Sequence, residues 1–349
     1  MNQAAISNRS EERYCSLSCR QIFLKISFFI YLSAAIPTVS NAQVLPGYKQ
    51  TGIFNEQELN IKEQWKNVSI NINAPLHFNN KGKTYLVFYA LPNGNSIEWT
   101  KGKKLNPGDD WHFNIQHIAA QARFVRNVDR KNNYIVIYLM AEQKSWPAWK
   151  RSTPDSVYII KNIIDSITDA FKTYKPKIIL NGHSGGGSFI FGFLDAVDEI
   201  PAQVERIAFL DSDYGYEEEK HKTKLINWLK QAKANKLLVL AYNDSVVIYN
   251  GKPLVSPTGG TWYRSRLMQR NLSESFPFTT IADTSFIKHR ALHDRVIFIL
   301  KENPHRLIFH TEQVEKNGFI LSLFSGTKFN SNKYFRYFGE RAYEKYIHD

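Results

Sequence analysis

Apolar residues in this chain gather in short runs that alternate with amphipathic stretches. The runs at 84–90, 134–140, 177–180, 206–210 and 236–242 predict buried strands of a mostly parallel sheet, and 68–78 alternates as a half-exposed strand would. Helical patterns follow at 111–126, with Asp109 or Asp110 as the N-cap, at 155–173 and at 217–232. This alternation predicts one α/β domain, a doubly wound sheet with helices on both faces.

The first 42 residues do not fit this pattern. Basic residues precede a short apolar run at 26–37, and Ser40 and Ala42 then stand at the −3 and −1 positions of a cleavage site. That is the layout of a secretory signal peptide, and the run is too short to span about 30 Å of hydrocarbon. We therefore expect a signal peptide at 1–42, a mature domain at 43–349, a secreted or periplasmic protein, and no membrane anchor after cleavage.

Composition narrows the classes of function. The formal net charge of +13 suggests nucleic acid as a partner, but the basic residues are spread over the whole chain and no binding motif accompanies them, so we expect none. Both cysteines, Cys15 and Cys19, lie within the expected signal peptide. The mature chain would then have no disulfide and no thiolate nucleophile or metal ligand, and we expect neither a metal nor an organic cofactor.

The segment KIILNGHSGGGSFIFGF at 177–193 places one serine among glycines between a predicted strand and a predicted helix. Gly182-His183-Ser184-Gly185-Gly186 matches G-x-S-x-G, in which a sharp turn projects the serine at the carboxyl end of a buried strand. A phosphate-binding loop does not fit, because no lysine follows the glycines and the spacing departs from G-x-G-x-x-G. A tight structural turn remains the alternative to a nucleophile.

On these residues the chain resembles the α/β-hydrolase superfamily over roughly 65–325, without resembling a particular subfamily. The resemblance implies that the acid and then the histidine follow the serine in the chain. The first candidate acid is Asp244, after the strand at 236–242, and the alternatives are Asp211 and Asp213, after the strand before it.

The candidate base is His310, which directly follows a predicted last strand at 306–309. His293 is the main alternative, and His289 lies in the same segment. A short helix with a glycine stop is expected at 312–319. By the same resemblance, the backbone amides of Gly185 and Asn95 would form the oxyanion hole.

Between Asp244 and the last strands lies an insertion at about 245–294 that could act as a lid. Its basic residues, Arg264 among them, would attract an anionic substrate, or they would form a solvated helix face. Three tryptophans, Trp146, Trp149 and Trp262, would contact sugar rings or acyl chains, although core packing is the usual place of a tryptophan.

The sequence as a whole favours a secreted serine hydrolase that forms an acyl-enzyme on Ser184. Its substrate would be a small-molecule or carbohydrate-linked ester. One alternative is a peptidase or amidase acting on cell-wall material. Another is a non-catalytic relative that binds an anionic glycan or a protein partner. A histidine within hydrogen-bond reach of Ser184 would separate catalysis from binding.

Overall fold

The computed structural model describes residues 44–104, 107 and 115–348. The chain divides into two units, Met1–Val39 and Ser40–Asp349, and the description concerns the second. The expected signal peptide at 1–42 and the expected caps Asp109 and Asp110 lie outside the described residues.

A large mixed sheet forms the centre of the domain. Its strand order is β1-β2-β3-β5-β4-β6-β7-β8-β13-β12-β11. The six strands from β5 to β13 run parallel, and antiparallel strands flank them on both sides. The strands are β1 Lys49–Thr51, β2 Glu56–Trp65, β3 Val68–Pro75, β4 Thr84–Ala90, β5 Asn133–Ala141, β6 Lys177–His183, β7 Val204–Leu210, β8 Lys236–Tyr242, β11 Thr279–Ala282, β12 Phe286–Ala291 and β13 Val296–Lys301. A separate hairpin pairs β9 Ile248–Tyr249 with β10 Lys252–Pro253.

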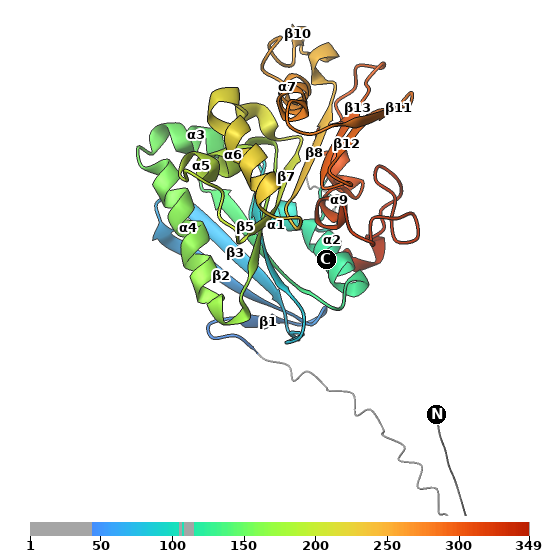
Figure 1. Ribbon diagram of the computed structural model, residues 1–349. Helices are drawn as coiled ribbons and strands as arrows, with labels where there is room; N and C mark the ends of the chain where they lie inside the picture. Colours follow the sequence, from blue (N-terminus) through green and yellow to red (C-terminus); the bar gives the residue numbers. More distant parts are fainter. Residues whose placement is uncertain (1–43, 105–106, 108–114, 349) are drawn as a thin grey trace, which may run out of the picture. The chain divides into compact units, whose positions relative to one another are not determined.

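Helices cover both faces of the sheet, as Figure 1 shows with α4 and α2 on opposite sides. One hydrophobic core lies under α3 Trp146–Ser152, α4 Ser156–Ala170, α5 Gly187–Asp195, α6 Glu218–Gln231 and α7 Thr261–Ser273. The other lies under α2 Ile118–Val128, α8 Glu312–Glu315 and α9 Gly318–Phe324, with α1 Ile97–Lys101 at its margin. The predicted fold class, a mostly parallel doubly wound sheet of the α/β-hydrolase type, is confirmed.

Most predicted strands lie where the apolar runs are, and two later predictions are wrong. The segment 306–309 is not a strand, since Arg306 has a positive φ of 57° and the side chains of Leu307 and Ile308 are exposed. The last parallel strand is β13, which is already paired on both edges by β8 and β12. Gly318 begins α9 instead of ending the preceding helix, because the left-handed Asn317 (φ 69°) separates α8 from α9.

The boundaries of two helices and the insertion also differ from the sequence patterns. Helix α2 begins at Ile118, after a left-handed His117, and α4 ends at Ala170 before a short 3₁₀ turn, Lys172–Tyr174. The insertion is largely built into the domain. Its β11 and β12 extend the main sheet, and α7 packs in the core.

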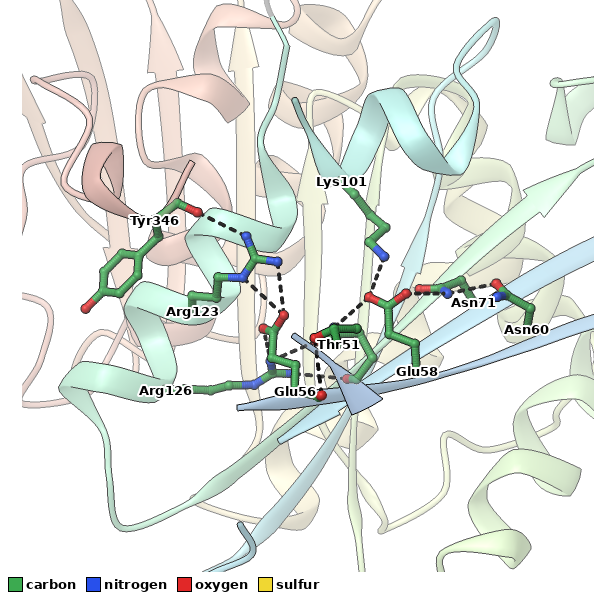
Figure 2. Close-up of polar contacts among 10 residues, drawn as sticks. Thr51, Glu56, Glu58, Asn60, Asn71, Lys101, Arg123, Arg126 and Tyr346 are labelled. Atoms are coloured by element: carbon green, nitrogen blue, oxygen red, sulfur yellow. Dashed lines mark hydrogen bonds and ion pairs between the residues drawn. The ribbon is translucent and has the colours of Figure 1, made fainter. Parts of the chain in front are cut away.

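A buried ionic cluster fastens α2 to the antiparallel edge of the sheet (Figure 2). Glu56 on β2 is 1% exposed and accepts from two guanidinium groups, Arg123 at 3.0 Å and Arg126 at 2.7 Å. Arg126 also donates to Asn73 Oδ1 on β3. Each of these charges is paired in the interior, so removal of one side chain would leave a buried charge without its counter-charge. The cluster therefore holds α2 firmly against β2 and β3.

Candidate active site

Ser184 lies at the sharp turn between the central strand β6 and helix α5. It opens a short 3₁₀ turn, Ser184–Gly186, with a left-handed φ of 52°, a conformation that costs a non-glycine residue roughly 1–2 kcal/mol. The neighbouring backbone approaches closely. A Cβ on Gly186 would lie 2.1 Å from the Ala90 carbonyl oxygen, and one on Gly187 would lie 1.7 Å from that of Ser212. The glycines after the serine are therefore required by space.

His310 is bound to a buried carboxylate. Its Nδ1 lies 2.5 Å from Oδ2 of Asp211, whose side chain is fully buried, and about a quarter of the His310 side chain is exposed. In the neutral imidazole, a hydrogen bond from Nδ1–H to a carboxylate fixes the tautomer and leaves Nε2 as the proton acceptor. His310 and Ser184 line the same pocket, and no hydrogen bond joins their side chains within the described part of the chain.

Asp211 is held rigidly at the carboxyl end of β7, the strand next to β6. Its backbone N–H donates to Leu240 O on β8 at 2.7 Å, and its φ is 50°. The second carboxylate oxygen accepts from the Thr261 hydroxyl at 2.5 Å. Both oxygens therefore have a strong partner, and the carboxylate is aligned with the imidazole of His310.

Asp244, the first candidate acid from sequence, has a different place. Its carboxylate accepts from the backbone N–H groups of Thr261 (2.9 Å) and Trp262 (3.4 Å), so it caps the first turn of α7. Burial, and next the nearby Asp211 carboxylate, raise the pKa of Asp244 to about 6. Asp244 therefore follows β8, one strand beyond the aspartate that contacts His310.

The third candidate acid, Asp213, also makes an internal contact. It accepts from the Ser265 hydroxyl at 2.8 Å, and burial raises its pKa well above the usual range. Of the three aspartates, the structure brings Asp211 to His310.

The alternative bases, His293 and His289, lie away from Ser184. His293 lies in the turn between β12 and β13, at the amino end of β13 and so at the opposite edge of the parallel sheet from Ser184. His289 is on β12 and its Nδ1 contacts the Thr280 hydroxyl at 2.8 Å.

A second imidazole, that of His183, packs against the ring of His310. It precedes Ser184 in the chain, its Nδ1 lies 2.7 Å from the carbonyl oxygen of Leu210, and its ring centroid lies 4.4 Å from that of His310. Burial, together with the nearby His310, lowers the pKa of His183 well below the usual range, so it packs as a neutral ring. Nothing in the sequence except its position in the motif pointed to this packing of His183.

Of the two expected oxyanion-hole residues, one borders the pocket and the other does not. Gly185 lines the pocket beside Ser184, whereas the Asn95 amide donates to Pro92 O in a turn and Asn95 does not border the pocket. Asn93 does border it. Its carboxamide oxygen would lie 2.0 Å from a Cβ on Gly185, so the two residues are in direct contact.

The pocket around Ser184 has a volume of about 650 Å³, within the usual range for small-molecule sites. One wall is the face of the turn and helix that carries Ser184, Ser188, Phe191 and Asp195. At its far end Asp195 lies 3.6 Å from the Lys150 ammonium. The remaining lining residues are Asn93, Pro147, Gly185, Ser212, Tyr214, Gly215, Glu217, Tyr242, Tyr249, Leu254, Val255, Ile308 and His310.

The tryptophans and the arginine expected to contact substrate lie outside this lining. Trp146 and Trp149 are at most 1% exposed and donate to Leu139 O and Lys66 O, and Trp262 is part of the same core. Arg264 donates to Tyr216 O. These contacts are structural. The aliphatic lining residues Leu254, Val255 and Ile308 come from short, irregular segments that carry no periodic signal, whereas Tyr242 ends the predicted strand β8.

No group of three or more possible metal ligands is found among the described residues. No helix within the described ranges is long and apolar enough to cross a membrane.

Together these features define a class of site. A serine in a left-handed turn after a central parallel strand shares a pocket with a histidine that is bound to a buried aspartate of the next strand. The order of these residues along the chain, serine, then aspartate, then histidine, is the order that the α/β-hydrolase fold uses.

Several solved hydrolase structures overlap this domain at low identity. A thermostable esterase is 16% identical with a TM-score of 0.44, and the match covers 78% of this chain and 63% of that one. Poly(aspartic acid) hydrolase-1 from Sphingomonas sp. KT-1 is 13% identical with a TM-score of 0.43, covering 80% and 100%. Est1E from Butyrivibrio proteoclasticus is 12% identical with a TM-score of 0.37, covering 76% and 97%.

No model of a known protein family matches the chain, and no curated protein sequence matches it. Similarity at this level does not indicate the substrate of this chain.

Proposed function

We propose that this protein is a serine hydrolase that cleaves an ester or amide through an acyl-enzyme on Ser184. The observation that carries the proposal is the 2.5 Å bond between His310 and the buried Asp211 in the pocket that Ser184 lines. A histidine oriented in this way has a direct catalytic use for a strained serine in the same pocket. The hydrogen bond between the two described side chains is not formed in this structure, and such contacts often tighten only when substrate binds.

In this mechanism His310 Nε2 takes the proton of Ser184 as Oγ attacks the carbonyl carbon. The imidazolium that forms is stabilised by the carboxylate of Asp211, and it then gives its proton to the leaving group. Water, activated by the same histidine, hydrolyses the acyl-enzyme. The backbone amide of Gly185 and the neighbouring Asn93 are the groups best placed to stabilise the oxyanion, in place of the expected Asn95.

An ester is the preferred substrate class, and a peptidase or amidase uses the same groups. The basic residues of the insertion do not support an anionic substrate. Arg264 is bonded to a backbone carbonyl, Arg290 pairs with Asp294, and Arg295 donates to the last carbonyls of α6.

Labelling with a fluorophosphonate probe tests the proposal. The wild-type protein is expected to take up one probe per chain, and the modified peptide is expected to contain Ser184. Ser184→Ala is expected to take up none, while Ser188→Ala, one helical turn further along the same pocket wall, is expected to label.

Intact mass and peptide mapping give the result, with circular dichroism as the check on folding. A folded wild type that does not label would favour the non-catalytic alternative.

We also propose that the protein is exported, with residues 1–42 as its signal peptide. The observation behind this is the basic segment, short apolar run and small residues at −3 and −1. The protein recovered outside the cytoplasm is then expected to begin at Gln43, which N-terminal sequencing would check. Recovery of the full-length chain from the cytoplasm alone would contradict it.

A further inference from the structure

Exposed apolar side chains gather at the mouth of the candidate active site. Nine large hydrophobic residues are exposed in the described chain, and five of them come from two short segments. Isolated residues of this kind are ordinary on a protein surface, but a group beside a pocket marks a binding surface. The five are Ile248, Tyr249, Leu254, Leu307 and Ile308.

Three of the five border the same pocket as Ser184 and His310. Tyr249 is 55% exposed, Leu254 37% and Ile308 41%, and all three line it. We call these three residues the apolar rim. Their partial exposure means that water covers apolar surface directly beside the proposed reacting atoms.

The two segments have little structural reason to be apolar. Tyr249 belongs to the β9–β10 hairpin, whose two strands pair with each other, and Leu254 follows the hairpin and donates its N–H to Val247 O. Ile308 lies two residues before His310, in the loop that replaces the expected strand. Polar side chains at these positions would leave the sheet and its two cores unchanged, so the apolar rim is best explained by a ligand.

We propose that the apolar rim binds an apolar chain of the substrate, an aliphatic or aromatic group several carbons long attached at the scissile bond. This inference rests on the proposed function for its catalytic part. The pocket is continuous from the rim to Ser184 and His310, so a chain lying on the rim would reach the nucleophile. Acetyl esters would bind without using this surface.

The expected preference follows from the apolar surface removed from water. A fully buried methylene contributes about 0.8 kcal/mol, which is roughly a fourfold change in affinity, and a half-exposed rim gives roughly twofold. Six additional methylenes, from acetate to octanoate, would then raise kcat/KM by roughly 50-fold.

The test compares p-nitrophenyl esters from acetate to octanoate, and acetate esters of ethanol to octanol, in three proteins. These are the wild type, the double variant Leu254→Ser/Ile308→Ser, and the control Ile281→Ser. Ile281 is 54% exposed on β11 and lies outside the pocket lining, so it matches the loss of an exposed aliphatic side chain.

The ratio of kcat/KM for the octanoate ester to kcat/KM for the acetate ester, or for the octyl ester to the ethyl ester, is expected to be high in the wild type and in Ile281→Ser. The ratio is expected to fall at least tenfold in the double variant. Ratios near one in the wild type, or ratios that the double variant leaves unchanged, would overturn the inference.

Binding of 1-octanol to Ser184→Ala, with and without the rim substitutions, separates this inference from the proposed function. In calorimetry, 1-octanol is expected to bind at least tenfold more weakly to Ser184→Ala that also carries Leu254→Ser and Ile308→Ser than to Ser184→Ala alone. This result would stand even if no ester were hydrolysed, and equal binding would count against the rim.

Discussion

Replacement of His310 by alanine is expected to lower kcat for a short acyl ester by about 10⁶-fold while leaving the fold intact. The Ser184 hydroxyl would lose the acceptor for its proton, and Asp211 would lose the imidazole that it orients. About a quarter of the His310 side chain is exposed, so truncation leaves only a small cavity. Initial rates with p-nitrophenyl acetate give the result, and circular dichroism gives the state of the fold.

The matched control is His293→Ala, which removes the alternative base from the turn between β12 and β13. It is expected to retain activity within a few-fold of wild type, because that turn lies at the amino end of β13. If His293→Ala lost activity and His310→Ala kept it, the proposed base would be wrong.

Much of the fold was predictable because the apolar runs mark the central strands directly. Strands β4 and β8 begin and end where their runs do, since both faces of these strands are buried by helices. The turn that carries Ser184 was predictable for a similar reason. A serine among glycines after a buried strand reflects close backbone approach, which constrains residue type strongly.

The acid of the site could not be fixed in the same way. Asp211, Asp213 and Asp244 all follow buried strands at the carboxyl end of the parallel sheet, and only the usual order of the fold ranked Asp244 first. Their roles are set by tertiary contacts. The loop before His310 brings the imidazole to β7, and Asp244 is instead bound by the first turn of α7. The lining at Tyr249, Leu254 and Ile308 was missed because it comes from short segments without periodicity.

Replacement of Asp211 by asparagine is expected to lower kcat by about 10⁴-fold, because the amide cannot stabilise the imidazolium and favours the wrong tautomer of His310. Asp244→Asn is the matched control, since it changes another buried carboxylate of the same cluster that does not contact His310. It is expected to keep kcat within about tenfold of wild type. The reverse pattern would restore Asp244 as the acid.

The wild type and Asp244→Asn are also expected to differ in how stability depends on pH. The folded pKa of Asp244, about 6, is above its ordinary value of 3.8, so the folded state binds this proton more tightly than the unfolded chain does. The stability that the protonated carboxyl provides is complete below about pH 4 and is lost as the pH rises through about 6, a change of at most about 3 kcal/mol. Asp244→Asn has no such proton to lose.

The free energy of unfolding of Asp244→Asn, relative to wild type, is therefore expected to rise between about pH 4 and about pH 8. Urea titrations across this range measure the difference. A difference that stayed constant would show that folding does not raise the pKa of Asp244, and that the two α7 amides offset both its burial and the nearby Asp211 carboxylate.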